Sequence, residues 1–125
     1  MKKVILLLLV SVSMAGTTVA QDAVMMAGTV YKKAFENERV RMLRVKFRPG
    51  ELTAPHTHPD YLLYVVEGGK IMTSDVEGVA TLIELMAGDY LWVPATKHSM
   101  KNVGTTTITG IAVELKEPPA ADPAK

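Results

Sequence analysis

The sequence predicts an all-β fold, either a small barrel or a sandwich. From residue 23 onwards, short runs of β-branched, aromatic and other apolar residues recur, and turns containing Gly, Pro, Asn or Asp separate them. No stretch carries an apolar stripe at helical spacing. Many short strands joined by glycine-rich turns are typical of barrels and sandwiches. The pattern does not determine the order in which the strands pair.

The first half of the chain is expected to open with strands. Residues 24–35 are consistent with one strand or a pair, ending at the polar turn 36–38. Residues 39–47 alternate between apolar and mostly basic positions, as a half-buried strand does. The apolar face of that strand consists of Leu43, Val45 and Phe47. The strand is expected to end at the turn Pro49-Gly50.

The second half is expected to supply six more strands, over residues 61–67, 70–74, 79–85, 90–93, 98–103 and 106–115. The first of these ends at Gly68-Gly69, a pair whose lack of side chains tolerates a positive φ. Pro94 closes the short strand that precedes His98. The last strand is rich in Thr, Ile and Val, which favour β-structure.

Composition limits the classes of function. A chain of 125 residues forms one domain, and its formal net charge of +1 gives no reason to expect a nucleic-acid partner. One basic run is interpreted as the solvated face of a strand; it contains Arg39, Arg41, Arg44, Lys46 and Arg48. The absence of cysteine excludes disulfides, thiolate metal sites and a cysteine nucleophile.

Both ends of the chain differ in composition from the predicted domain, which spans residues 21–116. Residues 1–20 resemble a secretory signal peptide, with Lys2 and Lys3 before an apolar centre and Ala20 at the expected cleavage site. The apolar run is far shorter than the roughly 20 residues that a membrane span requires, so no stable membrane anchor is expected. Residues 117–125 form a Pro/Ala tail that is expected to be disordered. These features predict a periplasmic or secreted protein.

Three histidines are the strongest candidates for a functional site. His56 and His58 are separated by one residue, and side chains at i and i+2 of a strand point to the same face. The third histidine, His98, also follows a proline that ends a strand. Imidazole is the commonest protein ligand for first-row transition metals. The spacing alone is equally compatible with a metal site and with three unrelated histidines.

The residues around these histidines resemble the two motifs of the cupin family. The first motif is matched by Gly50, five intervening residues, the pair His56 and His58, and then Gly68. The position of the family's glutamate ligand is occupied by Tyr61, and the interval after the second histidine is one residue shorter than usual.

The second motif is matched by Gly88, five intervening residues and Pro94, followed by His98 and, four positions on, Asn102. Thr96 replaces the glycine of this motif, and one residue is missing before His98. The resemblance covers roughly residues 39–115. Asn102 is interpreted as a hydrogen-bonding turn residue.

The resemblance implies a double-stranded β-helix, or jelly-roll, barrel that holds a metal ion. His56, His58 and His98 are the expected ligands; either these three alone hold the ion, or Asp60 or Tyr61 replaces the missing glutamate. Tyr61 and Asp60 are also the expected catalytic residues, as a base near the metal. The expected cofactor is Fe, Mn, Ni, Cu or Zn. Such cupins are commonly homodimers.

The function expected from this resemblance is that of a metal-dependent, dioxygenase-like oxidoreductase acting on a small molecule. One alternative is a metal-dependent isomerase or lyase. The other is a non-catalytic module that binds a metal or a small ligand. The fold hosts all of these activities, so it does not choose between them.

Overall fold

The structure, a computed structural model, describes residues 21–117. The predicted signal peptide at 1–20 and residues 118–125 of the predicted tail lie outside the described residues. In the part of the chain that the structure describes, one short helix precedes nine strands, which confirms the all-β prediction. These elements are α1 (Ala23–Met26), β1 (Tyr31–Glu36), β2 (Val40–Phe47), β3 (His56–His58), β4 (Tyr61–Glu67), β5 (Gly69–Ser74), β6 (Ala80–Leu85), β7 (Tyr90–Val93), β8 (Thr96–Asn102) and β9 (Ile108–Leu115). Within residues 21–117, no helix has the length and hydrophobicity needed to cross a membrane.

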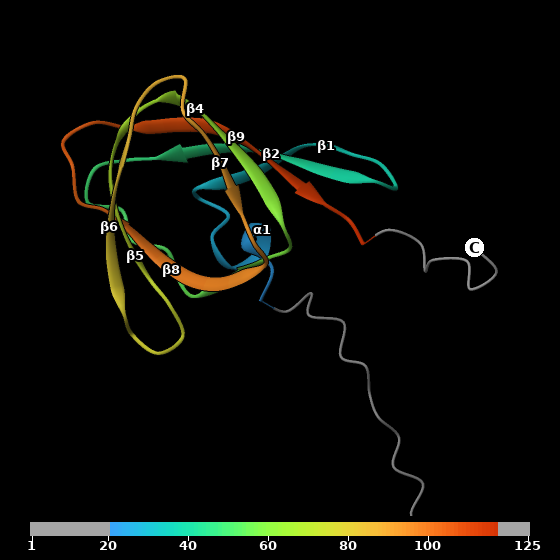
Figure 1. Ribbon diagram of the computed structural model, residues 1–125, viewed down its shortest axis with the longest axis horizontal. Coiled ribbons are helices and arrows are strands. Elements are labelled where there is room, and N and C mark those ends of the chain that lie inside the picture. Colours follow the sequence, from blue (N-terminus) through green and yellow to red (C-terminus); the bar gives the residue numbers. More distant parts are fainter. Residues whose placement is uncertain (1–20, 118–125) are drawn as a thin grey trace, which may run out of the picture.

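Two antiparallel sheets form the walls of a jelly-roll barrel (Figure 1). The larger sheet has the strand order β1-β2-β9-β4-β7, and the smaller has the order β3-β8-β5-β6. Strands β1 and β2 and strands β5 and β6 are consecutive in the sequence, but the other neighbours, such as β2 and β9 or β3 and β8, are distant. The hydrophobic pattern alone therefore did not give the pairing. The order also brings β3 beside β8, so the two segments that carry histidines become neighbours.

The alternating pattern of β2 is confirmed. Leu43, Val45 and Phe47 are buried in the core, whereas Arg44 and Lys46 between them are exposed. Strand β9 alternates in the same way, with Ile108 and Ala112 buried. Burial of one face of each strand against the other sheet is the main source of stability in such a barrel.

The opening segment differs from the predicted strand. Residues 23–26 form a single helical turn, capped by Asp22, whose carboxylate accepts a hydrogen bond from the Val24 amide at 2.9 Å. A Cβ at Gly28 would lie 2.8 Å from the Val24 carbonyl oxygen, so the chain turns tightly here before β1 begins. Because the helix is only four residues long, it leaves no periodicity in the sequence.

Gly68 is required for a different reason from the one predicted. Among the described residues, positive φ values occur at Gly50, Gly78 and Gly88, and neither Gly68 nor Gly69 has one. A Cβ at Gly68 would instead overlap the carbonyl oxygen of Leu85. The glycine therefore permits close approach of the β4–β5 connection to the end of β6.

Candidate metal centre

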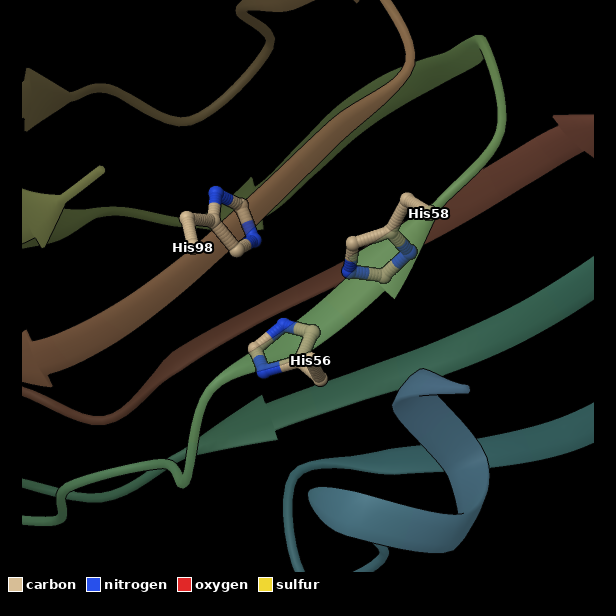
Figure 2. A group of neighbouring side chains, drawn as sticks. All are labelled: His56, His58 and His98. Atoms are coloured by element: carbon tan, nitrogen blue, oxygen red, sulfur yellow. The ribbon is translucent and has the colours of Figure 1, made fainter. Parts of the chain in front are cut away.

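The strand pairing brings the three histidines together. His56 and His58 lie on the same face of β3, and in the antiparallel ladder His56 is directly opposite His98 of β8. One potential ligand atom from each ring can be chosen so that all three lie within 4.8 Å of one another. Figure 2 shows the rings facing a common point from these two strands. The predicted convergence of the three residues is confirmed.

The nitrogen atoms of these rings fit a metal ion. The Nε2 atoms of His56, His58 and His98 are buried and have no hydrogen-bond partner. The Nδ1 of His56 lies 2.8 Å from the Ala54 carbonyl oxygen. A carbonyl only accepts hydrogen bonds, so this Nδ1 carries the proton and the Nε2 lone pair is free. Three unpartnered buried nitrogens of this kind match the donor set that a first-row transition metal takes.

Glu114 fixes the orientation of His58. One carboxylate oxygen, Oε1, lies 2.7 Å from His58 Nδ1, and the side chain is almost fully buried. The carboxylate accepts a hydrogen bond from the Nδ1–H group, which again leaves the lone pair of Nε2 free to bind a metal. A histidine held by a carboxylate in this way is oriented and made more basic toward a metal.

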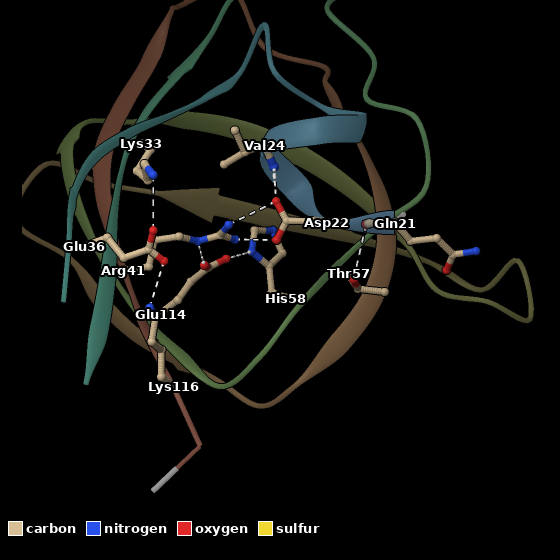
Figure 3. A network of polar contacts seen from close by, with 10 residues as sticks. All are labelled: Gln21, Asp22, Val24, Lys33, Glu36, Arg41, Thr57, His58, Glu114 and Lys116. Carbon is tan, nitrogen blue, oxygen red and sulfur yellow. Dashed lines mark hydrogen bonds and ion pairs between the residues drawn. The ribbon is translucent and has the colours of Figure 1, made fainter. Parts of the chain in front are cut away.

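Arg41 connects Glu114 to the N-terminal segment (Figure 3). Its Nε donates to Glu114 Oε2 at 2.6 Å, and its two terminal nitrogens donate to the carboxylate of Asp22. The pKa of Asp22 is lowered: burial acts to raise it, but hydrogen bonds from Arg41 and the Val24 amide prevail. The expectation that Arg41 belongs to a solvated basic face is therefore wrong. Its side chain is only 17% exposed because it neutralises two carboxylates at once.

The N-terminal segment also contacts the histidine strand. Gln21 accepts a hydrogen bond from the Thr57 hydroxyl through its carbonyl oxygen, and Asp22 forms an isolated bridge with Thr57. Tyr31, at the start of β1, packs edge-on against His56 and His58. The free edge of β3 is thus covered, which holds the two ligands in place.

Burial favours the neutral form of two of the imidazoles, His56 and His98. The pKa of His98 is lowered from 6.5 to about 3. Burial away from solvent is the larger cause, and the proximity of His56 and His58 is the smaller one. Burial also lowers the pKa of His56, although the hydrogen bond to Ala54 opposes the shift. Neutral rings at physiological pH are the form that binds metals.

Acidification is expected to destabilise the metal-free protein. Between about pH 6.5 and pH 5 an unfolded chain protonates His98, whereas the folded chain, with a pKa of about 3 at this residue, does not. The free energy of unfolding should therefore fall as the pH drops, by about 1.4 kcal/mol per pH unit at most for this one group. Urea unfolding in the presence of a chelator checks this, and His98→Gln should flatten the slope. Stability that rises on acidification would contradict the burial argument.

The two candidate substitutes for the family's glutamate lie in different surroundings. Tyr61 packs its ring against His58, with ring centroids 4.7 Å apart, and burial and the nearby Glu114 raise its pKa. Asp60 is exposed, and its Oδ1 accepts a hydrogen bond from the Ala95 amide at 2.7 Å. Among the His, Asp and Glu side chains of residues 21–117, the group that could hold a metal ion contains the three histidines and not Asp60.

The remaining motif residues have structural roles. Asn102 is fully buried, and its amide nitrogen donates to the carbonyl oxygens of Phe47 and Thr106. Asn102 is the last residue of β8, and these hydrogen bonds tie the end of the strand to two neighbouring segments. Thr96, which replaces the motif glycine, lies opposite His58 in the β3–β8 ladder. The shortened turn therefore still leaves His98 in register with His56.

A cavity of about 280 Å³ lies between the two sheets, and His98 is the one of the three histidines that lines it. His98, Tyr61 and Met100 are among the residues that line it. Met100 lies on the same face of β8 as His98, and both are buried on the inner side of the strand. Three aromatic residues of β4 and β7 do not line the cavity and are exposed on the outer surface: Tyr64, Tyr90 and Trp92.

Comparison with known proteins decides the family. The family model described as the cupin domain matches residues 43–114, which include both histidine segments and Glu114. The chain belongs to the cupin family. No curated protein matches this cupin.

Solved structures support the assignment. A cupin domain from Bordetella pertussis Tohama I is 26% identical, covers 70% of this chain and 93% of its own, and superposes with a TM-score of 0.64. A cupin superfamily protein from Desulfitobacterium hafniense DCB-2 is 21% identical over 70% of this chain and 77% of its own, with a TM-score of 0.54. A cupin family protein with a double-stranded β-helix fold from Methanocaldococcus jannaschii is 17% identical over 69% and 78%, with a TM-score of 0.55. The latter two show the fold only.

Proposed function

We propose that this cupin is an exported, metal-dependent enzyme that acts on a small molecule, with dioxygenase-like oxidoreductase activity. The observation that carries the proposal is the set of three buried, unpartnered Nε2 atoms beside a cavity between the sheets. The expected ion is Fe, Mn, Ni, Cu or Zn, and cellular supply influences which one binds.

The charge of the ligand set favours an anionic or enolic substrate. Three neutral imidazoles add no negative charge to a divalent ion, unlike a set that contains a carboxylate. A bound redox-active ion would supply a Lewis acid and an electron carrier with open coordination positions. The chain itself would hold the ion through His56, His58 and His98 and keep the His58 ring fixed through Glu114.

The proposal is tested by loading metal-free protein with each ion and following oxygen uptake. Enolisable 1,3-dicarbonyl and α-hydroxycarbonyl compounds serve as trial substrates. Oxygen uptake that matches substrate loss in an iron, manganese, nickel or copper form, and is lost in the zinc form and in His98→Ala, supports a dioxygenase. Absence of oxygen uptake with every ion and every compound would count against it.

An isomerase or lyase is a second candidate. Tyr61 lines the cavity and packs on His58, and its raised pKa keeps the hydroxyl protonated, so that it would serve as a proton donor rather than as a base. Substrate loss without oxygen uptake in both the zinc and iron forms would favour this candidate. Saturable binding without any turnover would favour a non-catalytic binding module.

Export is proposed from the leader-like residues 1–20 alone. Cleavage after Ala20 would make Gln21 the first residue of the mature chain. Mass spectrometry of protein recovered from the periplasm or the medium would test this cleavage.

A homodimer is proposed from an apolar patch on the outer face of the large sheet. The patch comprises Leu62, Tyr64, Val66, Tyr90 and Trp92, all between 40% and 77% exposed. Leu62 pairs with Trp92, and Tyr64 pairs with Tyr90, so the patch is continuous from β4 to the sheet edge at β7. Continuous exposed apolar surface of this kind is typical of protein interfaces. The patch carries no charge that would recognise a partner of opposite sign, so a second copy of the same patch is its expected partner.

Trp92→Lys is expected to convert this dimer into a monomer, because it places a charge in the apolar interface. Light scattering at micromolar concentrations should show the mass fall to that of one chain. Leu82→Lys is the matched control, since Leu82 is 57% exposed but lies on β6 of the other sheet. A monomeric wild-type protein would rule out the dimer.

A further inference from the structure

We propose that the cavity lined by His98 selects a ligand with one oxygen-donor, monoanionic head and an uncharged, apolar body. The inference rests on the proposed metal function, because the head is recognised by the ion. The body is recognised by this chain's own side chains.

The walls of the cavity are apolar and come from both sheets. Inward-facing side chains of β4, β5, β6, β7 and β8 line it, including Leu63, Ile71, Ile83, Leu91, Val93 and Met100. Four of these, Leu63, Ile83, Leu91 and Val93, are only partly buried although they pack against the core. Their accessible surface is apolar area that a ligand body would remove from water. Such contacts favour hydrocarbon over polar groups.

The cavity offers no positive charge apart from a bound ion. No lysine or arginine is found among the described residues that line it. The one lining carboxylate, Asp75, accepts hydrogen bonds from the amides of Glu77 and Val79 through Oδ1 and so belongs to the β5–β6 turn. A second anionic group on the ligand would be buried without a counter-charge, which is costly.

Threonine hydroxyl groups in the cavity wall offer hydrogen-bond partners to uncharged polar groups of a ligand. Thr73 and Thr81 form a cross-strand pair on β5 and β6, and both line the cavity. Thr96 lines it as well, two residues before His98. Hydroxyl groups both donate and accept hydrogen bonds, so the cavity tolerates an uncharged oxygen on the body.

The volume limits the size of the ligand. A water molecule in the liquid occupies about 30 Å³, so a cavity of about 280 Å³ has room for about nine waters. A single ring or a short chain fills this space. The ligand class is therefore a small, singly charged oxygen chelator with an apolar tail.

The test uses zinc-loaded protein and three hydroxamates, because zinc removes redox chemistry and the head stays constant. Acetohydroxamate has a methyl tail, benzohydroxamate has a phenyl tail, and succinic monohydroxamate has a carboxylate tail. We expect benzohydroxamate to bind at least tenfold more tightly than acetohydroxamate by titration calorimetry. Succinic monohydroxamate is expected to bind no more tightly than acetohydroxamate, and chelation of the zinc should abolish binding of all three.

A pair of variants assigns the selectivity to the cavity wall. Ile83→Lys introduces a positive charge into the cavity and should reverse the preference, so that the carboxylate tail binds more tightly than the phenyl tail. Leu82→Lys, the adjacent exposed position on β6, should leave the order unchanged. If Ile83→Lys does not fold, Thr81→Lys at a more exposed lining position replaces it.

Each failure has a separate meaning. If the protein takes up no zinc, the metal centre and this inference are both wrong. If zinc binds stoichiometrically but the three hydroxamates bind equally, or the carboxylate tail binds most tightly to the wild type, the inference is overturned while the metal centre stands.

Discussion

His98→Ala is expected to reduce bound metal from near one ion per chain to near zero, with the barrel still folded. His98 supplies the one candidate ligand from β8, and the two imidazoles of β3 that remain cannot enclose an ion from both sides. A site that has two ligands from one strand should bind a metal ion less tightly than a site that has three ligands from two strands. It should also discriminate less well between coordination geometries. Elemental analysis of protein purified without a histidine tag measures the content, and circular dichroism checks the fold.

Thr96→Ala is the matched control for His98→Ala. Thr96 lies on the same strand and lines the same cavity, but it offers no imidazole. The Thr96→Ala protein should bind as much metal as the wild type. If His98→Ala kept the full metal content, or if the wild type stayed metal-free after dialysis against each ion, the three-histidine centre would be wrong.

Glu114→Gln is expected to lower metal affinity by about 10- to 100-fold, the usual effect of losing a carboxylate behind a metal-binding histidine. The amide keeps the shape of the side chain but not its charge. The side-chain oxygen of the glutamine would still accept the hydrogen bond from His58 Nδ1. Its NH₂ group would then face the Arg41 Nε, and both of these groups are donors. The buried guanidinium would keep only Asp22 as a partner.

The same substitution should destabilise the metal-free fold by about 3 kcal/mol, the lower end of what breaking a buried ion pair costs, because Asp22 still pairs with Arg41. Competitive chelator titration measures the affinity, and urea unfolding measures the stability. Glu84→Gln, at an exposed position on β6, should change neither quantity. Unchanged affinity in Glu114→Gln would show that Glu114 does not position His58.

The strand register explains why the histidines could be predicted and Glu114 could not. His56 and His58 share a face by strand parity alone, and the family spacing adds His98. Glu114 lies 56 residues from His58, and they meet because β9 joins β4 in the larger sheet while β3 lies in the facing one. That order cannot be deduced from the hydrophobic pattern.

A signal for the ion-pair network was nevertheless present in the sequence. Arg41 has the same parity as Leu43 and Val45, and Glu114 has the same parity as Ala112. A charged residue on the apolar face of a strand must find a partner inside, because an unpaired buried charge is too costly. Two such residues of opposite sign on different strands indicate an internal ion pair. The opening helix left no comparable signal, since one turn has no periodicity.

The position of Trp92 makes this chain convenient for fluorescence spectroscopy. It is the one tryptophan in the sequence, and it lies on the outer face of β7. Leu91 and Val93, its neighbours on either side, face the cavity instead. Indole emission should therefore respond to association of two chains and remain nearly constant when a ligand enters the barrel. One intrinsic probe thus separates assembly from occupancy without any added label.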